Sequence, residues 1–267
     1  MRLNNIKKVF LASAALLSAM SMSAAERFVS FKQGDLLING NDKVEIYMDA
    51  NDCRGVSYAA NALVRDISKV SGSQATITSN RKATILVGTI GHSAAIDQLI
   101  KQKRINGNLL KGKREKFIIT VVDNQLVIAG SDRRGTIYGI YELSQQMGVS
   151  PWYDCADVPV EHHDSIFVNK GIYTDGEPAV RYRGIFLNDE APCLTSWVKN
   201  TYGTEYGDHR FYQRVFELIL RLRGNIMWPA MWGWAFYADD AENEKTADEM
   251  GVVMSTSHHE PMARNHQ

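Results

Sequence analysis

The chain has 267 residues, of which 45% are hydrophobic and 22% are charged, and its 30 basic and 30 acidic side chains give a formal net charge of zero. This composition excludes a mainly disordered chain, and the length suffices for one large domain or two of ordinary size. No basic stripe with interleaved aromatic residues occurs, so we expect no nucleic acid or other polyanion as a partner.

The first 25 residues have the pattern of an export signal. Three basic residues precede an apolar stretch over 9–20, and small residues at 23–25 mark a cleavage site before Glu26. The apolar stretch, about 12 residues long, is shorter than the roughly 20 that span a bilayer. We therefore predict a periplasmic or secreted protein with no membrane association after cleavage. Because residues 1–25 carry three basic and no acidic side chains, the mature net charge would be −3.

The three cysteines do not form a recognisable metal or disulfide pattern. Cys53, Cys155 and Cys193 are an odd number for an oxidising compartment, and their wide spacing matches no zinc site. One disulfide with a leftover thiol and three small, partly buried side chains are both consistent with this pattern.

Residues 26–150 alternate strand-like and helix-like segments, which predicts an N-terminal α/β domain with a sandwich-like arrangement. Strands are expected over 44–48 and 83–88, and a helix over 56–70 that ends at Gly72. Residues 116–122 and 125–130 have the pattern of a β-hairpin joined through Asp123-Asn124.

The stretch SDRRGTIYGIYELSQQMG, over 131–148, predicts a further helix. Asp132 suits its N-cap and Gly148 its end, and apolar side chains at 137, 140, 141 and 147 lie on one face. Gly135 and Gly139 each cost roughly 1 kcal/mol inside a helix, so we expect them to permit close packing on the sheet.

Residues 151–178 are polar and irregular, and we interpret them as a linker. They contain His162-His163-Asp164, which are metal-binding residue types. Adjacent side chains of an extended segment point in opposite directions, so we predict no metal site there.

Residues 179–267 have a strand–helix–strand–helix–strand pattern at short intervals. Strands are expected over 183–190, 225–232 and 252–260, with helices over 211–225 and around 240–250. This order is typical of a parallel sheet or barrel, and we predict an incomplete (β/α)8 barrel of about three strands.

Each of the three predicted strands ends in polar or aromatic residues. In a (β/α)8 barrel such strand ends build the active site. Carboxylates there can act as general acid and base, and tryptophans can support a sugar ring, which together indicate glycoside chemistry. The residues are Asn188, Asp189 and Glu190, then Trp228 and Trp232, then His258, His259 and Glu260.

Two alternatives remain open at these strand ends. Trp228 and Trp232 are also consistent with core positions, and for Trp228 the two interpretations have equal support. Asp189, His258 and Glu260 have zinc-ligand chemistry, which would indicate a metal-dependent hydrolase, although no HExxH motif is present. GxSxG, Walker and GxGxxG motifs are also absent from the sequence.

The motifs RGIFLNDE, NIMWPAMWGWAFYADD and MGVVMSTSHHEPMARN closely resemble the start of the catalytic barrel in glycoside hydrolase family 115, the xylan α-1,2-glucuronidases. GSDRRGTIYGIYELSQQMGVSPWYDCADVP resembles that family's N-terminal α/β domain. The resemblance implies an inverting hydrolase that removes glucuronic acid or its 4-O-methyl ether from glucuronoxylan without a cofactor or metal, and a homodimer in the full-length family.

By the same resemblance, Asp189, Trp232 and His258 are expected in a pocket for the uronate. Asn188, Glu190, His259 and Glu260 are expected as neighbours in the substrate site. The resemblance places the general acid on a later strand, so it is expected beyond Gln267, and the catalytic residues of this chain are not assigned.

A (β/α)8 barrel takes about 250 residues, and the stretch after residue 180 suffices for only three strands and two helices. We therefore expect the N-terminal portion of such an enzyme, truncated and inactive by itself. The alternative is a non-catalytic remnant that binds carbohydrate.

Overall fold

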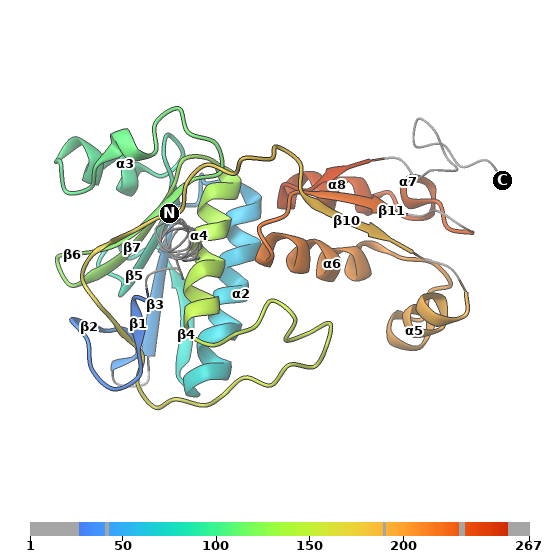
Figure 1. Ribbon diagram of the computed structural model, residues 1–267, viewed down its shortest axis with the longest axis horizontal. Helices are drawn as coiled ribbons and strands as arrows, with labels where there is room; N and C mark the ends of the chain where they lie inside the picture. The colour runs from blue at the N-terminus through green and yellow to red at the C-terminus, as the bar shows by residue number, and fades with distance from the viewer. Residues whose placement is uncertain (1–26, 41–42, 189–190, 230–232, 256–267) are drawn as a thin grey trace, which may run out of the picture.

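The computed structural model describes residues 27–40, 43–188, 191–229 and 233–255. It has a mixed α/β fold with a six-stranded sheet at one end and a three-stranded parallel sheet at the other, and two long helices lie between them (Figure 1). The predicted export signal over 1–25 lies outside the described residues. Within the described part of the chain, no helix is long and apolar enough to span a membrane.

The six-stranded sheet is mostly parallel. Strands β4, β3, β5 and β7 pair in parallel, and β6 pairs antiparallel with both β7 and β9. The strands predicted over 44–48 and 83–88 are β3 and β5. In spatial order the strands are β4 (Gln74–Thr78), β3 (Lys43–Met48), β5 (Ile85–Thr89), β7 (Gln125–Gly130), β6 (Phe117–Val122) and β9 (Ile172–Tyr173).

Helices cover both faces of this sheet because its strands are apolar on both sides. α2 (Arg54–Ser71) and α4 (Arg133–Gln146) pack on one face within the larger core cluster. α3 (Ala94–Lys101) and the short 3-10 helix η2 (Gly107–Leu109) cover the other face over a smaller cluster. α2 ends at Gly72, whose φ of +70° is the left-handed conformation expected of such a cap.

The predicted hairpin is confirmed. β6 and β7 pair in register from Phe117 opposite Gly130 to Val122 opposite Gln125. The two turn residues, Asp123 and Asn124, have φ of +50° and +61°, as a two-residue type I′ turn requires.

Helix α4 begins and packs as its sequence indicates. The Asp132 carboxylate accepts a hydrogen bond from the Gly135 amide at 2.8 Å. A Cβ atom at Gly135 would lie 2.3 Å from the Lys116 carbonyl oxygen, and one at Gly139 would lie 2.7 Å from Cγ2 of Ile128. Both glycines therefore allow α4 to approach β6 and β7 closely.

We expect Gly135→Ala to lower the free energy of unfolding by about 1–3 kcal/mol, because the added methyl group meets rigid backbone. Gly176→Ala is the matched control, since a Cβ atom there meets nothing within 4 Å. It should change stability by less than about 0.5 kcal/mol. Urea unfolding of both variants measures this, and equal midpoints would contradict the packing argument.

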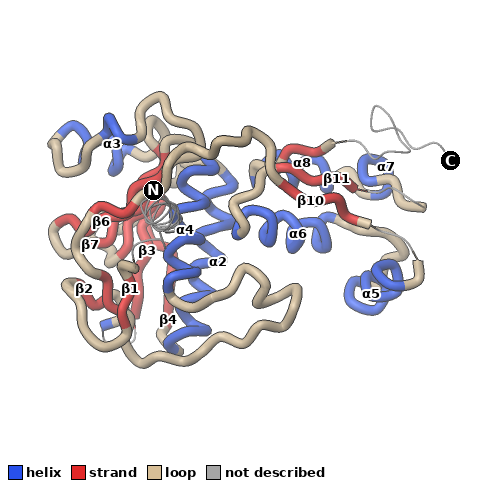
Figure 2. Tube along the Cα trace, viewed as in Figure 1, coloured by secondary structure: helices blue, strands red, loops and turns tan. Residues whose placement is uncertain are grey.

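The segment 151–178 is largely loop, as Figure 2 shows, but it also contributes strands. β8 (Phe167–Val168) pairs antiparallel with β1 (Val29–Ser30) and β2 (Leu36–Leu37), and β9 extends the six-stranded sheet. The prediction of an entirely irregular linker was therefore wrong in this respect, because strands of two residues leave no periodic pattern. Its boundaries as a domain linker stay a prediction.

The C-terminal part has the predicted alternation of strands and helices. β10 (Gly184–Leu187), β11 (Ile226–Pro229) and β12 (Val253–Met254) form a parallel sheet, with α6 (His209–Arg221) and α8 (Glu242–Met250) between successive strands. The sequence did not predict α5 (Cys193–Tyr202) or α7 (Phe236–Asp239).

The helix predicted over 211–225 has its apolar residues at 211, 215, 218, 219 and 222, spaced as on one helical face, and one of them is placed differently. Phe211, Val215, Leu218 and Ile219 are buried, but α6 ends before Leu222, which is 41% exposed. The turn after α6 carries this side chain away from the core.

Candidate active site

The parallel register brings the carboxyl ends of β10 and β11 to one edge of the small sheet. Leu187 lies opposite Pro229, and the amide of Ser255 donates to the Met227 carbonyl at 2.9 Å. The chain therefore leaves all three strands on the same side, as the prediction of a common site requires.

Of the predicted substrate-site residues, only Asn188 lies within the described structure. It is exposed and follows β10 directly. The remaining residues lie outside the described ranges, so their meeting at this edge stays a prediction. They are Asp189, Glu190, Trp232, His258, His259 and Glu260.

The two faces of the small sheet differ in exposure. Ile185 and Met227 face the helices, whereas Phe186 and Trp228, which are paired in register, are 44% and 50% exposed. Side chains alternate along a strand, so Phe186 and Trp228 share the face away from α6. In a (β/α)8 barrel this face is the interior, so the alternative of a core position for Trp228 stays open.

A groove of about 830 Å³ lies beside β10, between the 152–157 loop and helices α5 and α6. Asn188 and the exposed rings of Trp152 and Trp197 line it. Arg214 lies 5.1 Å from the Trp197 ring centre and donates to the Asp154 carboxylate at 2.7 Å.

The cysteines of this region are free thiols. Cys155 and Cys193 both line the groove, and Cys53 lies elsewhere, so the alternative of a disulfide is not seen. Burial raises the pKa of the Cys155 thiol, and the nearby Asp154 carboxylate adds to this effect.

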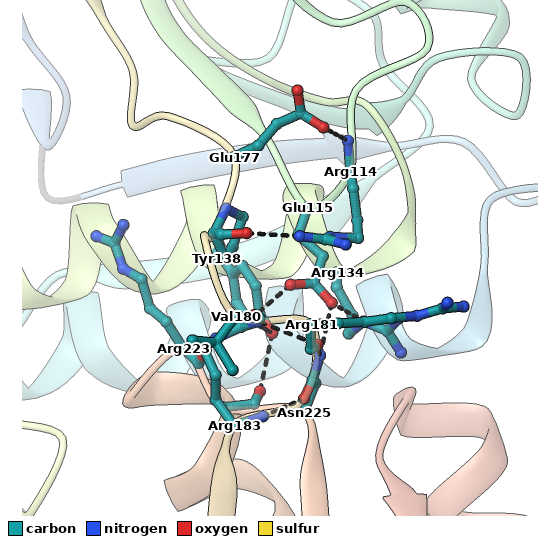
Figure 3. Close-up of polar contacts among 12 residues, drawn as sticks. Arg114, Glu115, Arg134, Tyr138, Glu177, Val180, Arg181, Arg183, Arg223 and Asn225 are labelled. Carbon is teal, nitrogen blue, oxygen red and sulfur yellow. Dashed lines mark hydrogen bonds and ion pairs between the residues drawn. The ribbon is translucent and has the colours of Figure 1, made fainter.

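A buried polar cluster holds the opposite, amino-terminal ends of the strands (Figure 3). Its centre is Glu115, whose side chain is fully buried and whose φ is +53°. The carboxylate accepts hydrogen bonds from the Arg134 and Arg183 guanidinium groups at 2.6 Å each. It also accepts one from the side-chain amide of Asn225 at 2.8 Å. The hydroxyl of Tyr138 on α4 donates to the Gly224 carbonyl at 2.8 Å.

This Glu115 cluster fixes the start of two neighbouring strands. Arg183 precedes β10 and Asn225 precedes β11, and the Arg183 amide donates to the Asn225 side chain at 2.9 Å. Burial by itself raises the pKa of Glu115, but the hydrogen bonds from Asn225 and Arg183 and the charge of Arg134 lower it overall. A carboxylate of the six-stranded part thus orients the strands whose far ends form the candidate site.

Two further contacts join the same parts of the molecule. Arg133 and Arg134, at the start of α4, donate to carbonyls at the end of α8, and Arg134 reaches Gly251 at 3.0 Å. The buried Arg221 of α6 donates to both carboxylate oxygens of Asp66 on α2, at 3.1 and 2.9 Å. Positive charges are stabilising near the carboxyl end of a helix, so Arg133 and Arg134 also stabilise the end of α8 electrostatically.

Sequence reasoning did not find Glu115, Arg183, Asn225 or the Asp66–Arg221 pair. The members of these pairs are separated by 42 to 155 positions in the chain. A single buried charge gives no periodic signal, and only the paired glycines of α4 indicated a close approach in this region.

No group of three or more metal-binding side chains exists among the residues described. Within the HHD motif, Nε2 of His162 lies 3.1 Å from the Asp164 carboxylate, and the His163 ring stacks on Phe31 with ring centres 3.5 Å apart. The absence of a metal site at this motif stays a prediction. The alternative ligand set of Asp189, His258 and Glu260 lies outside the described ranges.

Two solved structures share this fold at low sequence identity. A chitobiase from Flavobacterium johnsoniae superimposes with a TM-score of 0.51 at 11% identity, over 86% of this chain and 33% of that one. A β-hexosaminidase from Streptomyces plicatus does so with a TM-score of 0.52 at 12% identity, over 86% and 44%. These two likenesses concern the fold alone.

Sequence models then identify the family. Residues 175–267 match glycosyl hydrolase family 115, and residues 39–143 match the N-terminus of glycosyl hydrolase family 67. A family GH115 4-O-methyl-α-glucuronidase with specificity for decorated arabinogalactans is 38% identical, with a TM-score of 0.77 over 86% of this chain. The chain belongs to glycoside hydrolase family 115. It spans 30% of that relative's length, and no curated protein matches it significantly.

Proposed function

We propose that this chain forms part of an inverting glycoside hydrolase that removes glucuronic acid or its 4-O-methyl ether from polysaccharide side branches. The observation that carries the proposal is the 38% identity, over 86% of the chain, to a 4-O-methyl-α-glucuronidase. Because that relative has specificity for decorated arabinogalactans, both decorated arabinogalactans and glucuronoxylan are candidate substrates.

In this proposal β10, β11 and β12 are the first strands of a (β/α)8 barrel over residues 179–267. The parallel register and the intervening helices support it. The carboxyl ends of the strands would then present Asn188, Asp189, Trp232 and the 258–260 motif to the uronate. A histidine can hold a carboxylate through a charge-assisted hydrogen bond, and a tryptophan can pack against the sugar ring.

The same proposal makes the 267-residue chain inactive by itself. An inverting mechanism needs an acid and a base on opposite sides of the scissile bond, with carboxyls about 6.5–9.5 Å apart. Three strands contribute only part of the eight that build such a site. We further propose that residues 1–25 direct the protein to the periplasm or the exterior, where polysaccharide is available.

Release of glucuronic acid tests this function. The chain alone should release none from glucuronoxylan or from glucuronic-acid-decorated arabinogalactan. A fusion that continues into the remaining sequence of the GH115 relative should release it from at least one of them. The matched control is the same fusion with Asp189→Asn, which should lose most of the release.

The outcomes separate the alternatives. Release by the 267-residue chain itself would contradict the proposed position of the general acid. An inactive fusion that still binds polysaccharide would favour a non-catalytic carbohydrate-binding protein. Activity that a chelator abolishes and zinc restores would favour the metal-dependent alternative.

A further inference from the structure

A run of exposed basic side chains follows helix α3. Between residues 101 and 116 the sequence reads KQKRINGNLLKGKREK, in which the single acidic residue is the buried Glu115. We call the five exposed basic side chains of this segment the basic patch: Lys101, Lys103, Arg104, Lys111 and Lys113. It lies on the far side of the six-stranded sheet from β10–β12 (Figure 1).

The backbone beneath the basic patch is well anchored. Ile105 and Leu110 are 6% and 0% exposed and belong to the core cluster under α3. The Arg104 amide donates to the Leu99 carbonyl and the Lys111 amide to the Gly107 carbonyl, both at 2.9 Å. The backbone that carries the positive charges is therefore ordered, which reduces the entropic cost of binding.

Most of the positive charge in the basic patch is not neutralised. Arg104 pairs with Asp123, and Lys113 lies 3.2 Å from Glu177. No acidic partner occurs among the described residues for Lys101, Lys103 or Lys111. The net charge averages over the whole chain and therefore does not reveal this local excess of positive charge.

The chemistry of the basic patch favours carboxylates over nucleic acid. Residues 101–116 contain no aromatic side chain on which a base can stack. Lysine ammonium groups on flexible stems suit anions at irregular spacing. A polysaccharide with uronate side groups presents such anions along a single chain, so several weak contacts add to one binding event.

We propose that the basic patch is a second binding surface for an acidic polysaccharide, which it holds by its uronate carboxylates outside the candidate active site. This inference rests on the proposed function for the identity of the polymer. Binding and catalysis remain separable, because no residue of the basic patch belongs to the strand-end site.

Affinity electrophoresis of the purified chain in gels containing glucuronoxylan tests the proposal. The matched ligand is the same xylan after chemical reduction of its uronate carboxyls to alcohols. The chain should be retarded by the acidic polymer, little by the reduced one, and little by either at about 0.5 M salt, where the Debye length is short. The triple variant Lys101→Gln, Lys103→Gln, Lys111→Gln should bind about tenfold more weakly.

Three exposed lysines elsewhere provide the matched control variant. Lys32→Gln, Lys43→Gln and Lys170→Gln together remove the same charge and should leave binding within about twofold of the original. Equal loss in both triple variants, or equal retardation by acidic and reduced xylan, would overturn the proposal. So would equal or tighter binding to single-stranded DNA or to anionic lipid vesicles.

Failure of the proposed function has a different signature. Selective binding to acidic xylan through the basic patch, with no release of glucuronic acid by the fusion, would leave the surface intact and reject the activity. Release of glucuronic acid by the fusion without selective binding to acidic xylan would support the activity and reject the basic patch as a binding surface.

Discussion

Replacement of Arg221 should lower the free energy of unfolding by about 3–5 kcal/mol, because it leaves the buried Asp66 carboxylate without a cation. Replacement of Asp66 should cost less, because Arg221 keeps its hydrogen bond to the Glu217 carboxylate at 3.0 Å. The Asp66 side chain is fully buried and that of Arg221 is 2% exposed. Burial raises the pKa of Asp66 although Arg221 opposes the rise, which shows how strongly the carboxylate depends on its partner. Asp66→Leu and Arg221→Met, compared by urea unfolding, measure the effect.

The double variant Asp66→Leu, Arg221→Met is the decisive control. It removes both charges and keeps apolar volume, so it should be more stable than either single variant. The ring of Tyr141, 4.5 Å from the Arg221 guanidinium, then has an apolar neighbour. Strictly additive losses would show that the two side chains do not depend on each other.

Glu115→Gln should lower the free energy of unfolding by about 3 kcal/mol, at the lower end of the cost of a broken buried pair. The lower end applies because Arg134 and Arg183 keep 24% and 23% of their side-chain surface exposed. The matched control is Glu177→Gln, which removes an exposed carboxylate paired with Lys113 and should leave the unfolding midpoint nearly unchanged. Equal midpoints for the two variants would contradict a central role for the Glu115 cluster.

The Glu115 effect should depend on pH with a definite sign. The pKa of Glu115 is lowered on folding, so its contribution is fully present above the unfolded value of about 4.3 and is lost as the pH falls through the folded value. The stability difference between the original chain and Glu115→Gln should therefore be constant near neutral pH and shrink below about pH 4. A difference that grows on acidification would contradict the lowered pKa.

Both predictions concern the contact between the six-stranded part and the small parallel sheet. The Glu115 cluster holds the starts of β10 and β11, and the Asp66–Arg221 pair joins α2 to α6. Loss of either contact should loosen the strands whose far ends form the candidate site. In a family 115 fusion, Glu115→Gln should thus also reduce glucuronic acid release at temperatures where the original fusion is still active.

Much of the local structure followed from the sequence by itself. Asp123-Asn124 predicted the hairpin because both residues tolerate positive φ, and Asp132 predicted the start of α4 because its carboxylate can accept from the first helical amides. The alternation after residue 183 likewise predicted parallel strands joined by helices. The turn and cap signals depend on residues within one turn, and the alternation depends only on the order of elements along the chain.

Only the tertiary structure decided which distant residues meet. β8 joins β1 and β2 across more than a hundred residues through strands too short to show a period. Glu115 and Asp66 are buried carboxylates whose distant partners follow no repeat. Periodicity reports which face of an element is apolar, whereas long-range hydrogen bonds and ion pairs depend on how the elements come together in space.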